Sequence, residues 1–273
     1  ALADYNAREK TLGTYAMAQL NYGNLLVLPG VRYERTDVDY TGYEVIFDEE
    51  GDYLSTNPLD GTSDYDIWMP HLHLRYRLGD SRRTNLRAAF TRTLARPNYY
   101  DIVPYELQIR EDSEIERGNP NLKPTRSWNF DLLAEHFLPS VGVLSGGFFH
   151  KRLDDYIYVF TYEEDRDGET FDVTQPLNGE KGTLTGFEAA IQSARVLGDF
   201  GLLANYTYTD SEAEFLDREG EKASLPGQAK HVGNVALLFE QGGFSGRLAL
   251  NFHGRYIAEV GGDASEDVYK DNH

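Results

Sequence analysis

The sequence contains no cysteine, only two methionines and no long apolar run. Without cysteine the chain cannot form a disulfide, so in a cell-envelope protein its stability depends on the hydrogen-bonded sheet. Wholly apolar stretches such as Val235 to Phe239 are far shorter than the roughly 20 residues of a membrane-spanning helix. A helical membrane protein is therefore excluded. A membrane β-barrel is not, because its polar interior lowers the mean hydropathy, here -0.53.

Basic residues are scarce, with 26 Lys and Arg against 45 Asp and Glu, for a formal net charge of -19. This balance argues against a nucleic-acid partner, because phosphate binding needs a basic face. From Asp37 to Asp66 there are ten acids and no Lys or Arg, and similar clusters occur at Glu163 to Asp172 and Glu212 to Glu221. We interpret these clusters as solvated loops between strands, with divalent-cation sites as the alternative.

The chain is instead rich in Tyr, Phe and Gly, and in long stretches that alternate with a period of two. In Thr84 to Pro97, for example, Leu86 and Phe90 share one face while Arg87 and Thr91 share the other. This period indicates strands. Each stretch continues for about ten residues, longer than the five or six of an average soluble strand and close to what a tilted strand needs to cross a bilayer.

About ten strands are predicted in this way, and the connections between them alternate in length. Short turns are expected at 22–24, 79–83, 139–142, 198–199 and 241–243, and long polar loops at 39–64, 97–126, 161–181 and 211–229. All the long loops then emerge on one side of the sheet. The faces of 143–160 stay open, because Gly146-Gly147 and Asp154-Asp155 interrupt the alternation.

Long strands with short turns at one end and long loops at the other are typical of an outer-membrane barrel with short periplasmic turns and long extracellular loops. The predicted fold class is therefore all-β, an antiparallel transmembrane β-barrel segment. The alternative is a soluble β-sandwich or propeller. For that fold the strands are too long and the loops too one-sided, and no blade-length repeat is visible.

Several motifs agree with this fold. They are Gly30-Val-Arg-Tyr-Glu-Arg-Thr36, Thr91-Arg-Thr-Leu-Ala-Arg-Pro-Asn98, Gly118-Asn-Pro-Asn-Leu-Lys-Pro124 with Ser127, Asn129 and Asp131, Gly146-Gly-Phe-Phe-His-Lys151, Asp155-Tyr-Ile157 and Gly186-Phe-Glu188. Their combination resembles the C-terminal barrel half of TonB-dependent outer-membrane receptors. The resemblance implies that residues 1–273 are a single partial domain, about ten strands of a probable 22-stranded barrel, with the N-terminal plug and the final strands absent.

The resemblance also implies a location in the outer membrane of a Gram-negative bacterium, in contact with its lipid. The implied function is uptake of a scarce bulky solute, energised by TonB acting through the missing plug region. A ferric siderophore and an oligosaccharide are rival cargoes, and the acidic loops disfavour an anionic iron chelate. The alternatives from other classes are a passive outer-membrane channel, a structural barrel and a soluble carbohydrate-binding β domain.

Neither the residues nor their spacing predicts an enzyme, a cofactor or a metal site. His71 and His73 share a face and His253 lies on another strand, which leaves a metal site incomplete. Glu163 to Gly168 is faintly similar to a calcium loop, but Thr174 stands where the bidentate Glu is required.

The segment Pro97 to Arg126 is the predicted ligand-binding loop. Its candidate residues are three aromatics that would stack on sugar or siderophore rings, Tyr99, Tyr100 and Tyr105, and two cations that would bind an anionic chelate, Arg110 and Arg117. Tyrosines at strand ends also form membrane-interface girdles, which is the alternative interpretation. Within this loop, the two prolines of Gly118 to Pro124 fix φ and shape the start of the returning strand.

Overall fold

The computed structural model describes residues 4–79, 81–139, 142–166, 168–215, 218, 221–262 and 264–273, and the side chains of 194–197 lie outside this description. The elements are β1 (Asn6–Met17), β2 (Leu20–Tyr22), β3 (Leu25–Phe47), β4 (Tyr53–Leu78), β5 (Thr84–Ala95), α1 (Tyr99–Ile102), β6 (Glu106–Ile109), β7 (Glu114–Arg117), β8 (Thr125–Leu138), β9 (Gly142–Asp154), β10 (Ile157–Arg166), β11 (Glu169–Asn178), β12 (Lys181–Leu197), β13 (Phe200–Glu214), β14 (Lys222–Ala223), β15 (His231–Gln241), β16 (Phe244–His253), β17 (Tyr256–Glu259) and β18 (Val268–Lys270). No helix within the described ranges is long and apolar enough to cross a membrane.

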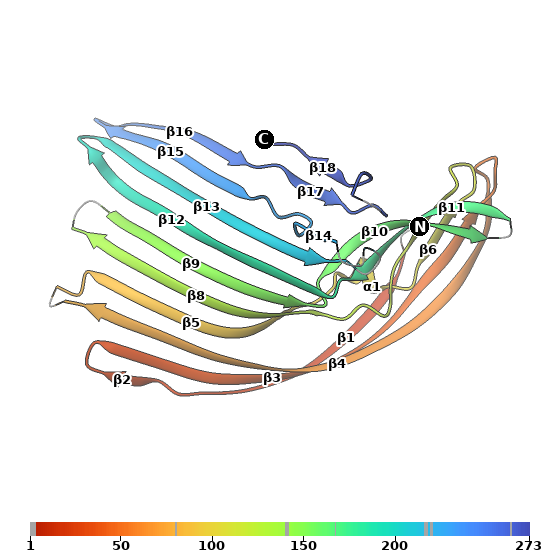
Figure 1. The fold of residues 1–273 in the computed structure, drawn as a ribbon, viewed down its shortest axis with the longest axis horizontal. Coiled ribbons are helices and arrows are strands. Elements are labelled where there is room, and N and C mark those ends of the chain that lie inside the picture. Colours follow the sequence, from red (N-terminus) through yellow and green to blue (C-terminus); the bar gives the residue numbers. More distant parts are fainter. Residues whose placement is uncertain are drawn as a thin grey trace.

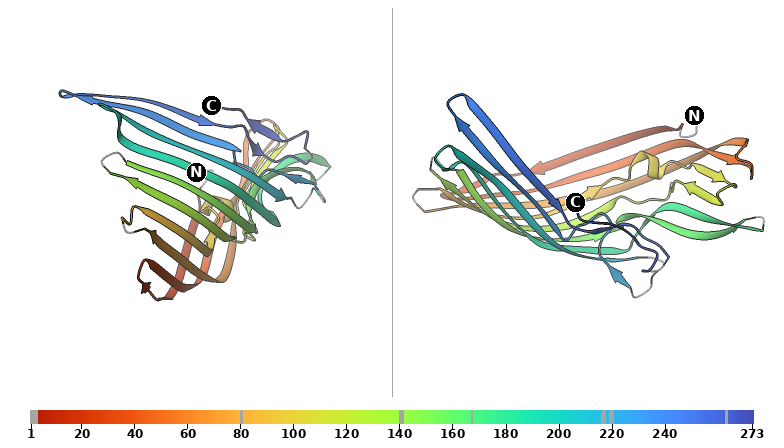
Figure 2. Two further views of the ribbon diagram at one scale, coloured as in Figure 1. Left: turned by 60° about the vertical axis from the view of Figure 1, so that its left-hand side comes forward. Right: turned by 90° about the horizontal axis from the view of Figure 1, so that it is seen from above.

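A single 16-stranded sheet dominates the fold, in the order β10-β11-β7-β6-β3-β4-β5-β8-β9-β12-β13-β15-β16, with β1, β2 and β14 paired beside this path. The long strands from β3 to β16 pair with antiparallel neighbours, and each of the ten predicted stretches contributes to the sheet. The all-β antiparallel prediction is therefore confirmed. The sheet curves strongly and stays open in the part of the chain that is described (Figures 1 and 2).

The two ends of this sheet differ. The tight connections that join β2 to β3, β4 to β5, β8 to β9, β12 to β13 and β15 to β16 gather at one end, which we call the turn end. The longer connections gather at the other, the loop end, together with α1, β10 and β11 (Figure 1). Residues 80, 140 and 141, at the centres of two predicted turns, lie outside the described residues, but the strands that flank them are paired neighbours. The one-sided arrangement of loops is confirmed.

The sheet has one apolar face and one polar face. Paired residues on adjacent strands point to the same side, so the register Leu72, Phe90, Phe130 defines what we call the outer face. The exposed apolar side chains of the outer face include Trp68, Leu72, Tyr76, Leu86, Phe90, Phe130, Leu132, Phe148, Phe187, Val235, Leu237, Leu248, Leu250 and Phe252. The register next to it, His73, Ala89, Asp131, belongs to the inner face. The apolar side chains of the outer face are thus uncovered rather than packed into a second layer.

Buried apolar side chains concentrate at the loop end. Three clusters form there: Val38, Tyr40, Ile102, Val103 and Leu122; Ile115, Phe171 and Val173; and Tyr156, Tyr158, Phe160, Ala213, Phe215, Leu225, Ile257 and Val260. Each brings together residues that are distant in the sequence. The connections at this end therefore form a packed layer, which we call the loop layer.

The predicted acidic loop from residue 39 to residue 64 is wrong. β3 continues to Phe47, β4 starts at Tyr53, and the two pair along this whole length as one hairpin. The reason lies in the alternation. Asp37 and Asp39 are exposed, while Val38 and Tyr40 between and beside them are buried. Acidic residues on one face of a strand do not interrupt it when the other face packs.

The other three predicted loops also contain ordered strands. Residues 211–229, of which 216, 217, 219 and 220 lie outside the described residues, include the end of β13 and all of β14. Residues 97–126 include α1 and the β6–β7 hairpin, and residues 161–181 include most of the β10–β11 hairpin. The stretch 143–160 divides into β9 and β10 at Asp155, whose φ of 56° breaks the extended backbone. Short strands within polar sequence carry little period-two signal, so their pairing was missed.

A buried polar network joins β5 to β8 on the inner face. Asn129 Nδ2 donates to Thr93 Oγ1 at 3.1 Å and to Thr91 Oγ1 at 3.2 Å, and Ser127 Oγ donates to Asn129 Oδ1 at 2.8 Å. Replacing Asn129 by alanine removes these bonds and leaves the buried Ser127 hydroxyl without its acceptor. We expect a loss of about 1–3 kcal/mol in the free energy of unfolding of the protein, measured by urea denaturation.

The matched control is Asn205→Ala. Asn205 also lies on a strand and accepts a bond from Asn234 Nδ2 at 2.8 Å, but this pair is exposed. Its removal should change the unfolding free energy by less than about 0.5 kcal/mol. Equal losses for the two variants would show that burial of the Asn129 network contributes nothing.

Candidate functional site

The segment predicted to bind ligand is held in place at the loop end by its own Gly118 to Pro124 turn. Tyr40 Oη donates to Pro120 O at 2.9 Å, Asn119 Nδ2 donates to Pro176 O at 3.0 Å, and Lys123 N donates to Asn178 Oδ1 at 2.8 Å. These bonds tie the turn to β3 on one side and to β11 on the other. The contacts support the structural role that its prolines predict.

Two of the predicted tyrosines meet at one carboxylate. The rings of Tyr100 and Tyr105 lie 4.6 Å apart, and their hydroxyls donate to Glu116 Oε1 at 3.1 Å and 2.8 Å. Burial, with the hydrogen bonds to Tyr100 and Glu116, raises the pKa of Tyr105 above its ordinary value. Tyr99 stands beside this cluster in the sequence, on α1, and its side chain is 46% exposed. Within the predicted set, the exposed aromatic surface therefore comes from Tyr99 and the exposed part of Tyr100.

The predicted arginines have carboxylate partners within the loop layer. Arg117 lies 2.9 Å from Glu164 and 3.3 Å from Glu106, and Arg166 closes the ring at 2.5 Å from Glu106 and 2.9 Å from Glu164. This four-member ring joins β6, β7 and β10. Arg110 lies 3.8 Å from Glu169. Both arginines thus support the loop layer, and binding of an anionic ligand by them stays a prediction.

The structure therefore brings together only part of the predicted set. Tyr100 and Tyr105 are in contact, whereas Arg110 and Arg117 lie in separate ion pairs. Glu116, the residue that joins the tyrosines, was not predicted. The alternation in Glu106 to Ile109 and Glu114 to Arg117 was the one available signal for this hairpin, and at four residues a strand it is weak.

The stabilisation that the ion-pair ring provides should depend on pH. Burial acts to raise the pKa of Glu164, but the hydrogen bond from Arg166 and the charges of Arg117 and Arg166 outweigh it and hold this pKa below the ordinary 4.5. A lowered pKa in the folded state stabilises the protein above the ordinary value, and the stabilisation is lost as the pH falls. We expect the protection factors of the β10 and β11 amides, which compare each exchange rate with the intrinsic rate at the same pH, to decrease as the pH falls below about 4.5.

Glu164→Gln should remove this pH dependence, because the amide does not titrate. Glu163→Gln, a change at the exposed neighbouring residue, should leave it intact. Protection factors that decrease to the same extent with acid in wild type and Glu164→Gln would contradict the role given to Glu164.

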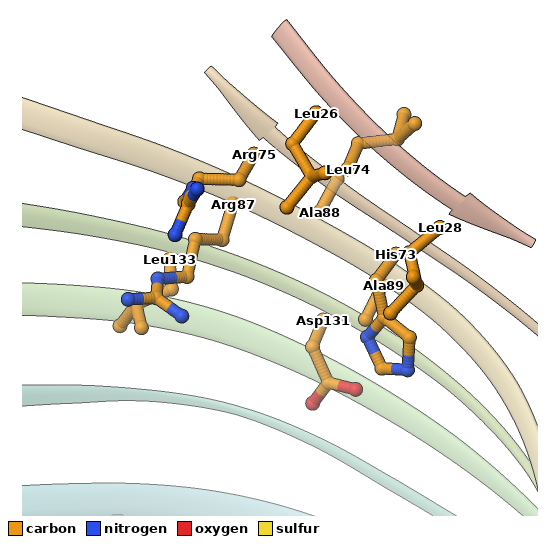
Figure 3. A pocket seen from close by; sticks show the side chains of 10 residues that line it. All are labelled: Leu26, Leu28, His73, Leu74, Arg75, Arg87, Ala88, Ala89, Asp131 and Leu133. Atoms are coloured by element: carbon orange, nitrogen blue, oxygen red, sulfur yellow. The ribbon is translucent and has the colours of Figure 1, made fainter. Parts of the chain in front are cut away.

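A hollow lies on the inner face nearer the turn end. Its lining comes from β3, β4, β5 and β8, and Figure 3 shows the side chains of His73, Arg75, Arg87 and Asp131 gathered there with those of Leu26, Leu28 and Leu133. Arg87 Nε donates to Glu135 Oε2 at 2.8 Å. Among the described residues no group of three or more His, Asp or Glu side chains is arranged to hold a metal ion.

An open antiparallel sheet with an exposed apolar outer face, a polar inner face and its long connections at one end is the wall of an outer-membrane β-barrel. A family model described as "TonB dependent receptor-like, beta-barrel" matches residues 2–272, so the chain belongs to this family. The resemblance stated from the motifs is therefore confirmed. The chain is an outer-membrane protein of the Gram-negative type, and its family consists of transporters rather than enzymes.

Solved structures with the same fold are receptors and transporters of this family. The hemophore receptor HasR of Serratia marcescens has 16% identity and a TM-score of 0.65, over 90% of this chain and 44% of HasR. The ferric-catecholate import receptor Fiu of E. coli K12 has 13% identity and a TM-score of 0.68, over 98% of this chain and 37% of Fiu. The siderophore receptor PiuA of Acinetobacter baumannii has 12% identity and a TM-score of 0.66, over 99% of this chain and 36% of PiuA.

This chain thus spans less than half the length of each of these receptors. At these identities the comparison shows a shared fold. A comparison with curated protein sequences gave no match.

Proposed function

We propose that this chain is the barrel part of a receptor that takes up a scarce, bulky solute across the outer membrane with energy from TonB. The observation that carries the proposal is the pairing of an uncovered apolar outer face with a polar inner face and a packed loop layer at one end. A wall of this kind encloses a polar interior, and an ordered layer at its mouth offers a binding surface. Because the chain covers 36–44% of the receptors compared, we further propose that residues 1–273 form one partial domain of a longer receptor that carries the plug and the TonB-contacting segment.

The other classes of function fit less well. A soluble carbohydrate-binding domain would bury its strand-borne leucines and phenylalanines, yet Leu248 and Leu250 are 69% and 72% exposed. A passive channel or structural barrel has no need of a packed loop layer at one end. A receptor does need one, because it binds a solute before the solute passes.

Two cargo classes each have an observation in their favour. The receptors compared include ones named for a ferric catecholate and for siderophores, which favours a ferric chelate. In the loop layer, however, Arg110 and Arg117 already face carboxylates, and the aromatic Tyr99 and Tyr100 are the exposed members of the predicted set. This arrangement favours a neutral, ring-bearing solute such as an oligosaccharide, which stacks on aromatic faces.

The test is a binding screen of the full-length receptor against ferric siderophores and oligosaccharides, followed by uptake into cells with and without TonB. We expect one class to bind and its uptake to stop when TonB is removed. Failure of both classes to bind, together with uptake that is unchanged without TonB, would overturn the proposal.

For the solute identified, Tyr99→Leu combined with Tyr100→Leu should lower affinity about three- to tenfold, the loss expected when an aromatic contact is removed. Tyr53→Leu is the matched control, because Tyr53 is exposed at the tip of the β3–β4 hairpin, outside the 97–126 segment. An unchanged affinity in the double variant would place the solute elsewhere on the loop layer.

A further inference from the structure

A row of cationic and aromatic side chains crosses the outer face near the loop end. Trp128 of β8 is paired in register with Arg92 of β5 on one side and with Arg152 of β9 on the other. The Arg92 guanidinium lies over the Trp128 ring, 5.4 Å from its centroid, and its Nη1 donates to Trp68 O at 3.3 Å. We call Arg92, Trp128 and Arg152 the basic row.

The basic row marks the border of the exposed apolar face. Phe90 and Phe130, two residues along β5 and β8 toward the turn end, are paired in register and exposed. Phe90 stacks on Trp128 with ring centroids 5.1 Å apart. One step toward the loop end, the outer-face row becomes charged, with Arg126, Asp154 and Lys181 in register. Tryptophan at such a border is typical of the level where hydrocarbon meets lipid headgroups.

The two arginines of the row have no carboxylate partner among the described residues, although Arg92 contacts the Trp128 ring and Trp68 O. Arg126 pairs with Asp155, but among the described residues Arg92, Arg152 and Lys181 form no ion pair, and Asp154 is the nearby carboxylate of the same face. This excess of positive charge occurs in a chain whose net charge is -19. Cations that face lipid at the headgroup level and have no carboxylate to neutralise them attract an anion from the membrane.

We propose that the basic row binds a phosphorylated lipid of the outer leaflet, with its phosphates on Arg92 and Arg152. Guanidinium groups bind phosphate through paired hydrogen bonds, and the boundary between hydrocarbon and headgroups strengthens that interaction relative to water. The two arginines belong to strands separated by one other, so their backbones lie about 10 Å apart. This spacing fits a headgroup that carries two separate phosphates better than one with a single phosphate, and the acyl chains then lie on Phe90 and Phe130.

The test uses the full-length receptor, stripped of lipid in detergent and exposed to lipid A that carries two phosphates. Lipid retained by the folded receptor is counted by native mass spectrometry. Arg92→Gln and Arg152→Gln should each lower the apparent affinity about fivefold, the effect of one basic residue near an anionic lipid surface. In the double variant the affinity should fall by the product of the two factors. Dephosphorylated lipid A with the same acyl chains should bind wild type no more tightly than phosphorylated lipid A binds the double variant.

The matched control is Arg87→Gln with Lys151→Gln, two changes on β5 and β9 that face the interior instead of the lipid. This variant should retain lipid A like wild type. Each variant is checked for folding by its resistance to unfolding in denaturing detergent without heating. Retention at the wild-type level in the Arg92 and Arg152 double variant, equal binding of the dephosphorylated lipid, or displacement of the lipid by inorganic phosphate alone would overturn the proposal.

Discussion

Replacing Leu132 by arginine should destabilise the full-length receptor in a bilayer by about 2–4 kcal/mol, the largest single effect we expect on the barrel wall. Leu132 lies on β8 with a side chain that is 43% exposed on the outer face, in register with Ala88 and Phe148. In a membrane this exposed surface meets hydrocarbon, where a guanidinium loses its hydration without gaining a partner. The measurement is equilibrium unfolding by guanidinium chloride in phospholipid vesicles.

Its control is the adjacent leucine. Leu133 points the opposite way, into the inner-face hollow next to Arg87, so arginine there stays hydrated. The same substitution at Leu133 should cost no more than about 1 kcal/mol, through repulsion between exposed like charges. Two neighbouring positions with one identical change thus test which face meets lipid. If Leu133→Arg proves as costly as Leu132→Arg, the assignment of the faces is wrong.

The same physics explains which parts of the fold were readable from the sequence. Where one face meets hydrocarbon and the other water, every second residue must be apolar over the whole bilayer thickness, and a long period-two pattern results. β5 and β8 show it clearly, and their register pairs Phe90 with Phe130 as the pattern requires. Location of the turns followed from the same pattern, because each tight turn interrupts it.

Beyond the apolar band this signal disappears. The loop-end parts of β3 and β4 extend the sheet beyond this band, and their outer positions are acidic instead of apolar, so the sequence pattern there predicts a loop. On the inner face of β3, Glu34, Thr36, Val38 and Tyr40 are buried and keep the strand period there, the last two packed with Ile102 of α1. Strand pairing outside the membrane depends on such contacts with distant residues, which local composition does not reveal.

The position of the candidate segment was predictable, but the arrangement of its side chains was not. The predicted long connection 97–126 does lie in the loop layer, and its role in binding a ligand stays a prediction. What the sequence could not show is that Glu164, 47 residues along the chain, reaches Arg117 and neutralises it. Long-range ion pairs decide which cations remain for a ligand, and they depend on how the hairpins stack.

Replacing Gly118 by alanine should disrupt the loop layer while leaving the barrel wall folded. The carbonyl oxygen of Val103 lies so close to Gly118 that an added Cβ would overlap it, and the Tyr105 ring blocks the other side at 3.0 Å. The 103–105 backbone must then move, which separates Tyr105 from Glu116 and weakens the bond from Gln175 Nε2 to Gly118 O, now 3.2 Å. Overpacking of this kind costs about 1–3 kcal/mol.

In Gly118→Ala we expect faster proteolysis within 97–126 and weaker solute binding. The temperature at which the barrel unfolds should not change. Gly233→Ala is the control, because a Cβ on that β15 glycine would meet its nearest neighbour, Asn205 O, at an ordinary 3.5 Å. Since both substitutions add one methyl group to a glycine with negative or extended φ, they differ mainly in the space around it. Equal protease resistance of the two variants would mean that the 97–126 segment is not packed against its own turn, and the binding surface would then have to be sought outside it.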